Sequence, residues 1–77
     1  MMKFKIVETN FTKKYDWLFR LIADDGEVYF IMIEDFYQRH NIQSPISKLE
    51  LDYLDKGQYV SGVSQSIETL NVITRIL

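Results

Sequence analysis

Basic and aromatic residues are interleaved near the start of this 77-residue chain, in a pattern suited to single-stranded nucleic acid. Lysine and arginine neutralise phosphates and aromatic rings stack on unpaired bases, so together they hold a strand without reading its sequence. The competing interpretation places Trp17 in the hydrophobic core, the commoner fate of such a residue. The nucleic-acid-binding residues that this pattern predicts are Lys13, Lys14, Tyr15, Trp17 and Arg20, with Tyr29 or Phe30 across a hairpin.

A second group of aromatic and basic residues follows in the middle of the chain. Tyrosine and arginine are favoured anchors of protein interfaces. The alternative prediction is therefore a protein-interaction or self-assembly module, which would also use apolar hairpin surface. The predicted interface residues are Phe36, Tyr37, Arg39 and Tyr53.

The residue types that catalysis needs are sparse. The chain has no cysteine, and its one histidine, His40, ends a predicted helix, where a capping or solvated role is expected. Glu34 and Asp35 stand at the start of that helix, where their charges suit the helix dipole better than acid–base chemistry. The acids are too scattered for a metal site, and the three glycines are too dispersed for a phosphate-binding loop. The sequence predicts no enzyme, no metal and no cofactor.

The net charge of −2 is unevenly distributed. Residues 1–20 carry five basic and two acidic side chains, a net charge of +3, whereas residues 21–77 carry four basic and nine acidic, a net charge of −5. An acidic protein does not attract nucleic acid through its bulk charge. The N-terminal residues could still form a local positive patch.

Length and hydropathy predict one soluble domain over residues 1–77. No apolar run approaches the roughly 20 residues that a membrane-spanning helix needs. The first residues lack the apolar segment of a signal peptide. We therefore expect a cytoplasmic location.

The strongest structural signal is a β-hairpin over residues 15–33. Two aromatic-rich runs, Tyr15–Ala23 and Val28–Ile33, flank a turn that contains Asp25-Gly26, and Asp-Gly between such runs is typical of a hairpin. Both faces are largely apolar, so we expect both to be covered, by barrel closure or by a partner. Strand alternation predicts a shared face for Tyr15, Trp17, Phe19 and Leu21.

The turn allows two registers. A two-residue Asp25-Gly26 loop would pair Phe19 with Met32 and Leu21 with Phe30. A type I turn followed by Gly26 as a left-handed bulge suits the residues better. The preferred register pairs Leu21 with Tyr29, Phe19 with Ile31 and Arg20 with Phe30, the last as a cation–π contact.

The other elements carry weaker signals. Residues 3–8 and 58–65 have the pattern of strands, the second with Gly62 at a bulge or bend, and residues 34–40 that of a short helix. Residues 48–53 suit a further short helix, with Ile46, Leu49 and Leu54 along one side, and Leu51 fits a strand equally well. Residues 70–77 are rich in β-branched side chains and favour a strand over the alternative, an amphipathic helix from Ser66.

Three strands, a helical insertion and two strands follow one another in the order of an OB-fold barrel. An SH3-like barrel and an α+β sheet are the alternatives. The phrase Gly57-Gln-Tyr-Val-Ser-Gly-Val63 also resembles the opening strand of S1-type RNA-binding OB domains. We predict a mainly β, five-stranded OB-like barrel with a short helical insertion between the third and fourth strands. The binding face of such a barrel includes the second and third strands and the loop between the first two, where residues 13–20 fall.

Overall fold

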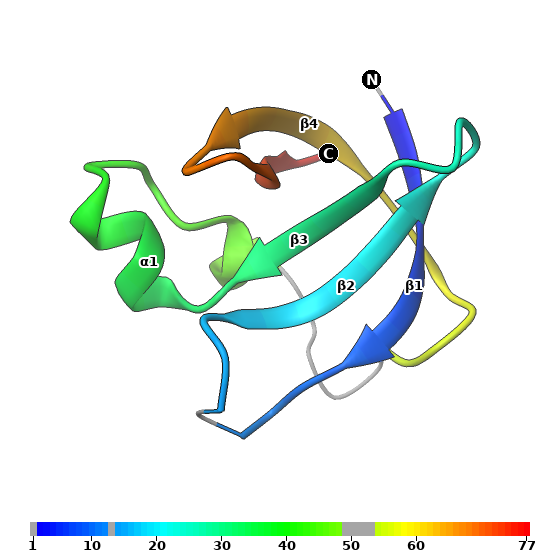
Figure 1. The fold of residues 1–77 in the computed structure, drawn as a ribbon, viewed down its shortest axis with the longest axis horizontal. Helices are drawn as coiled ribbons and strands as arrows, with labels where there is room; N and C mark the ends of the chain where they lie inside the picture. Colours follow the sequence, from blue (N-terminus) through cyan, green and yellow to red (C-terminus); the bar gives the residue numbers. More distant parts are fainter. Residues whose placement is uncertain (1, 13, 49–53) are drawn as a thin grey trace.

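Five strands and two short helical segments make up the computed structural model, which describes residues 2–12, 14–48 and 54–77 (Figure 1). The helical segments are the α-helix α1 and the 3₁₀ turn η1, and both lie between the third and fourth strands. The elements in chain order are β1 (Met2–Thr9), β2 (Trp17–Ala23), β3 (Val28–Met32), α1 (Glu34–Arg39), η1 (Pro45–Lys48), β4 (Tyr59–Ile67) and β5 (Leu70–Ile76).

The strands close into a barrel in the order β1-β2-β3-β5-β4, and β4 returns to β1. All neighbours are antiparallel except β3 and β5, which are parallel and pair at Phe30 and Val72. The prediction of a mainly β, five-stranded barrel with a helical insertion between strands 3 and 4 is confirmed. Residues 49–53, most of the second predicted helix, lie outside the described part of the chain.

The β2–β3 hairpin has the preferred register. Leu21 lies opposite Tyr29, and Gly26 adopts φ = 84°, the left-handed conformation that glycine reaches without strain. The Gly26 N–H donates to the carbonyl of Ala23, 3.0 Å away, and the Ala23 N–H donates to the carbonyl of Glu27, 3.1 Å away. These bonds fix which residues of β2 and β3 share a face.

A bulge in β2 divides the residues that simple alternation places together. The pairing of β2 with β3 shifts between Trp17, opposite Met32, and Phe19, opposite Ile31. Phe19 and Leu21 are fully buried in the barrel, whereas Trp17 is only half-buried. The predicted single face for these residues is therefore wrong, because the extra residue of a bulge reverses the alternation.

Two buried clusters hold the fold together. The first fills the barrel, and the second lies where α1 covers β3 and β5. The barrel cluster consists of Phe4, Ile6, Phe19, Leu21, Ala23, Tyr29, Ile31, Val60 and Ile73. The cluster beside α1 consists of Met32, Phe36, Tyr37 and Val72.

The C-terminal residues form the strand β5, as the β-branched composition predicts, and not the alternative helix. Ile67 of β4 pairs with Leu70 of β5, so Glu68 and Thr69 make a two-residue turn. Both have positive φ, 51° and 65°. Asn-Gly is the usual choice in such a turn, and a β-branched threonine there is strained. This turn gives no sequence signal.

Candidate nucleic-acid interface

Three aromatic rings form a row on the outer side of the β2–β3 hairpin. Tyr15 and Trp17 are stacked, with ring centres 5.7 Å apart and planes 8° from parallel. Trp17 lies 5.9 Å from Phe30 in turn, at an interplanar angle of 51°. Tyr29 and Ile31, on either side of Phe30, are buried in the barrel, so Phe30 points outward. We call Tyr15, Trp17 and Phe30 the aromatic row.

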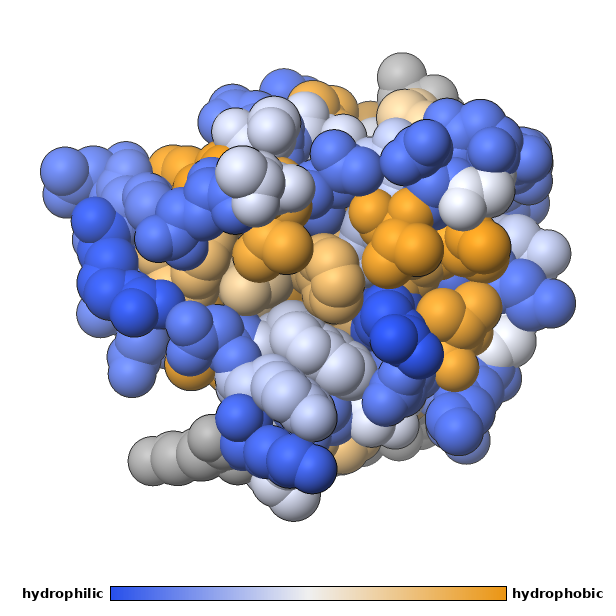
Figure 2. Space-filling view, in the orientation of Figure 1, coloured by the Kyte–Doolittle hydropathy of each residue, from blue (hydrophilic) through white to orange (hydrophobic). Residues whose placement is uncertain are grey.

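Trp17 and Phe30 of the aromatic row pack on one side against the buried cluster beside α1, and apolar surface continues from the row along β2 and β3 (Figure 2). Figure 2 shows apolar side chains gathered over β2 and β3, the two strands that cross the middle of Figure 1. The outward-facing Val28 is 41% exposed, and Ile22, its cross-strand neighbour, is half-buried. Barrel closure therefore covers only the inner face of the hairpin. The outer face remains in part accessible.

Lys14 and Tyr15 lie at the entry to β2. The ammonium of Lys14 is over the ring of Tyr15, with Nζ 5.3 Å from the ring centre, and the Tyr15 side chain is 49% exposed. Asn10 holds the end of the β1–β2 loop, because its Nδ2 donates to the carbonyl of Trp17 at 3.3 Å. Lys13, also predicted here, lies outside the described residues.

Arg20 is opposite Phe30, as the register predicts, but the expected cation–π contact is not formed. Its guanidinium instead makes an ion pair with Glu8, its cross-strand neighbour on β1. A carboxylate within reach attracts a guanidinium more strongly than a ring face does, since the bond is charge-assisted. Both side chains are partly exposed, so the pair is screened and contributes little stability.

A second ion pair borders the aromatic row. Arg39 of α1 lies with Nη2 3.1 Å from Oδ2 of Asp16, the residue between Tyr15 and Trp17. The Arg39 guanidinium also lies over the ring of Phe36, 5.6 Å from its centre. The arginines at both borders of the row are thus neutralised by carboxylates. Lys14 has no carboxylate within ion-pair distance among the described residues.

Two of the four predicted protein-interface residues are buried. Phe36 is 1% exposed and Tyr37 is fully buried, because α1 turns both inward over β3 and β5. Of the other two predicted interface residues, Arg39 is exposed at the end of α1 and Tyr53 lies outside the described residues. The expectation that Phe36 and Tyr37 present contact surface is corrected: they are core residues of this barrel.

Tyr37 has a structural task that explains its burial. Its hydroxyl accepts a hydrogen bond from the Met32 N–H of β3 at 3.1 Å and donates one to the Ile73 carbonyl of β5 at 2.6 Å. Burial disfavours the charged phenolate and raises the pKa of Tyr37 to about 12, although the bond from Met32 opposes the shift. The hydroxyl bridges the two strands beside their Phe30–Val72 pair.

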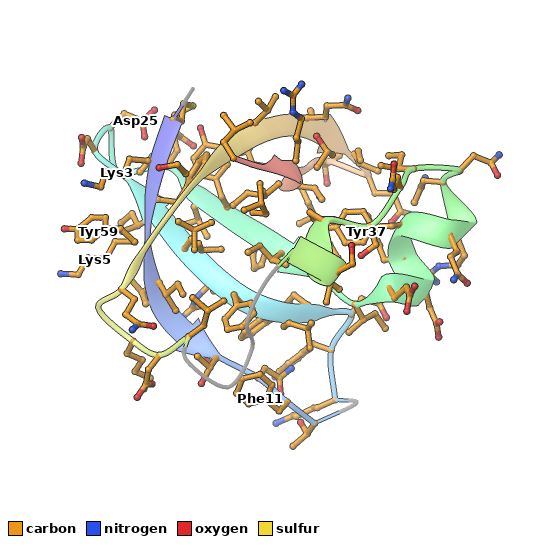
Figure 3. The ribbon with its side chains drawn as sticks, turned by 180° about the vertical axis from the view of Figure 1, so that it is seen from behind. Lys3, Lys5, Phe11, Asp25, Tyr37 and Tyr59 are labelled. Atoms are coloured by element: carbon orange, nitrogen blue, oxygen red, sulfur yellow. The ribbon has the colours of Figure 1, made fainter. Side chains whose placement is uncertain are left out.

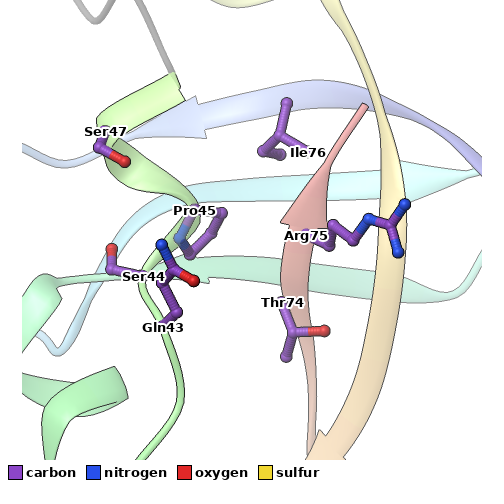
Figure 4. Close-up of a pocket in the computed structure, with 7 residues that line it drawn as sticks. All are labelled: Gln43, Ser44, Pro45, Ser47, Thr74, Arg75 and Ile76. Carbon is purple, nitrogen blue, oxygen red and sulfur yellow. The ribbon is translucent and has the colours of Figure 1, made fainter.

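A small pocket lies on another part of the barrel, between η1 and β5 (Figure 4). Its volume is about 200 Å³, and its lining includes Gln43, Ser44, Thr74 and Arg75. Among the described residues that line it there is no carboxylate and no histidine. Within residues 2–12, 14–48 and 54–77, no three His, Cys, Asp or Glu side chains group closely enough to hold a metal ion.

Sequence reasoning missed the acids that neutralise the two arginines. Glu8 lies opposite Arg20 only because the β1–β2 register shifts between Ile6 and Glu8, and such a shift has no local sequence signal. Asp16 carries no such signal, since its partner Arg39 belongs to a helix that packs there only in the folded chain. The bulge at Trp17 gives no signal either.

The chain was compared with protein-family models, curated proteins and solved structures, and none of these matches it. In the part of the chain that the structure describes, no helix has the length and apolarity to cross a bilayer.

Proposed function

We propose that this protein is a non-catalytic module that binds single-stranded nucleic acid on the outer face of β2 and β3. The observation that carries the proposal is the aromatic row, three neighbouring rings on one partly accessible surface. Stacked bases need such π faces, and every base has one, so the binding would tolerate many sequences.

The barrel topology supports the proposal. A closed five-stranded barrel in the order β1-β2-β3-β5-β4, with helical residues between β3 and β4, agrees with an OB fold. OB folds bind oligonucleotides or oligosaccharides on the face of strands 2 and 3 and at the loops that follow strands 1 and 4. The aromatic row lies on that face. The fold is an argument by analogy, whereas the row is evidence from the site itself.

The free energies favour replacement of the Lys14 ammonium by a nucleic-acid base on the Tyr15 ring. The cation–π contact of Lys14 is worth about 0.5–1 kcal/mol at an exposed position. A stacked base contributes about 1–3 kcal/mol. The stacking free energy of a base on the Tyr15 ring therefore exceeds the cation–π free energy that is lost when the base displaces the ammonium. The released Lys14 is then free to pair with a phosphate.

The test is a fluorescence titration with a thymidine oligonucleotide at low salt. Trp17 is the only tryptophan, so its emission reports stacking directly. We expect quenching on binding, and about 5- to 150-fold weaker affinity for Tyr15→Ala, the equivalent of one lost stack. Lys14→Ala should reduce the slope of log K against log salt by about 0.7, the change for one phosphate on a single strand.

Tyr15→Phe is the matched control, because it keeps the ring and should bind like the parent chain. An oligonucleotide that leaves Trp17 emission unchanged at low salt and shows no binding by sedimentation would exclude this function.

The apolar surface supports one alternative, a protein-interaction module. Val28 is 41% exposed beside Ile22, and such a patch suits a protein partner or a second copy of this chain. The buried Phe36 and Tyr37 take no part in it. Sedimentation at micromolar concentration distinguishes the two functions: Val28→Lys should dissociate a dimer, whereas a monomer that binds oligonucleotide supports the nucleic-acid function.

A further inference from the structure

A second cluster of cations and an aromatic ring lies on β1 and β4, away from the aromatic row. Figure 3 shows the Tyr59 side chain between those of Lys3 and Lys5 at one edge of the barrel. Lys3 Nζ is 4.9 Å from the centre of the Tyr59 ring, and Lys5 is the direct cross-strand partner of Tyr59. Tyr59 is 55% exposed, and both lysines are exposed.

The charges of these lysines are not neutralised within the described chain. No carboxylate of residues 2–12, 14–48 or 54–77 lies within ion-pair distance of Lys3 or Lys5. Arg20 and Arg39 beside the aromatic row, in contrast, are both paired with acids. Lys14 at the aromatic row also lacks a carboxylate partner among the described residues, so the outer surface carries two separate places where such a lysine lies beside an aromatic ring.

The strand register leads from the second cluster to Val28 on β3, two residues before Phe30 of the aromatic row. Tyr59 on β4 pairs with Lys5 on β1, Lys5 pairs with Ile22 on β2, and Ile22 pairs with Val28 on β3. Neighbouring strands lie about 4.8 Å apart, so these three strand-to-strand steps cover about 14 Å around the barrel. Ile22 and Val28 make part of the surface between the clusters apolar.

We propose that Lys3, Lys5 and Tyr59 form a second contact point for the same single-stranded nucleic acid that occupies the aromatic row. One base stacks on Tyr59 in place of the Lys3 ammonium, and the two lysines pair with the flanking phosphates. This inference rests on the proposed function and extends it from β2–β3 to β4. It predicts that affinity depends on the length of the nucleic acid.

The test compares thymidine oligonucleotides of about 5 and about 15 nucleotides, since single OB folds cover about 4–16. Tyr59→Ala should weaken binding of the longer oligonucleotide about tenfold and leave binding of the shorter one unchanged. The double variant Lys3→Ala/Lys5→Ala should reduce the salt slope for the longer one by about 1.4, or about 0.7 per phosphate. Tyr59→Phe keeps the ring and should restore the affinity.

Arg75→Ala is the control for loss of a positive charge elsewhere, because Arg75 is an exposed cation on β5 at the separate pocket. It should leave the salt slope unchanged. The second contact point is overturned if Tyr59→Ala and the lysine double variant both bind the longer oligonucleotide as tightly as the parent chain does. In that case, loss of binding to both oligonucleotides in Tyr15→Ala would still support the proposed function. A parent chain that binds neither oligonucleotide overturns both.

Discussion

At the residue scale, the pairing of Arg20 with Glu8 removes one cation from the proposed binding face. The ion pair is partly exposed and weak, so its loss costs little stability, yet it occupies a guanidinium next to the aromatic row. Glu8→Gln keeps the shape and removes the charge. We expect it to strengthen oligonucleotide binding and to increase the salt slope by about 0.7, as the freed Arg20 takes one phosphate.

Asp24→Asn is the control for this prediction. It removes the same charge from the exposed hairpin turn, four residues from Arg20 along the chain. If both variants strengthen binding equally and with the same salt slope, the gain comes from net charge and the specific role of Glu8 is refuted.

Tyr37 gives a prediction about stability at the same scale. Tyr37→Phe leaves the Met32 N–H and the Ile73 carbonyl without their buried partner. We expect the free energy of unfolding to fall by about 1–3 kcal/mol, measured by urea denaturation at neutral pH. Tyr15→Phe, which removes an exposed hydroxyl, should change it little. Equal stability of both variants would show that the bridge contributes nothing.

The pKa of Tyr37 adds a pH dependence with a definite sign. In the folded chain the pKa is about 12 against an ordinary value of 10, so the folded state holds its proton in a range where the unfolded state has lost it. The stabilisation is complete below pH 10 and decreases by about 1.4 kcal/mol per unit as the pH rises toward 12. The difference in stability between the parent chain and Tyr37→Phe should therefore narrow between about pH 10 and about pH 12. A constant difference would contradict the raised pKa.

At the scale of elements, the β4–β5 turn is the place where local sequence and structure disagree. Thr69 at φ = 65° is strained, and glycine would remove that strain. We expect Thr69→Gly to raise the free energy of unfolding by about 1 kcal/mol and the melting temperature by about 4–8 °C. Thr74→Gly, the same substitution inside β5, should lower both. A lower melting temperature for Thr69→Gly would refute the strain.

The elements also show how far sequence reasoning extends. The β2–β3 register followed from the residues, because Asp24-Asp25-Gly26 has the chemistry of one turn type and Gly26 adopts the φ that turn requires. The face of Trp17 did not, since a bulge depends on the strands that pair with it and not on a local residue type. The inward turn of Phe36 and Tyr37 was missed for a similar reason: their covering role exists only once β3 and β5 are adjacent.

At the scale of the whole molecule, the mainly β, five-stranded barrel followed from the order of the elements, and the location of the candidate site followed in part. Tyr15, Trp17 and Lys14 lie together as the sequence predicts, and Phe30 is the partner across the hairpin. Lys3 and Tyr59 are 56 positions apart, and only the pairing of β1 with β4 brings them together. Contacts of this kind require the closed barrel.

The parallel pairing of β3 with β5 has a consequence for synthesis of the chain. β5 is the neighbour of both β3 and β4, so the ring stays open until residues 70–76 have left the ribosome and paired. Before that point β3 presents an unpaired edge next to an apolar outer face, which is a template for pairing with another nascent chain.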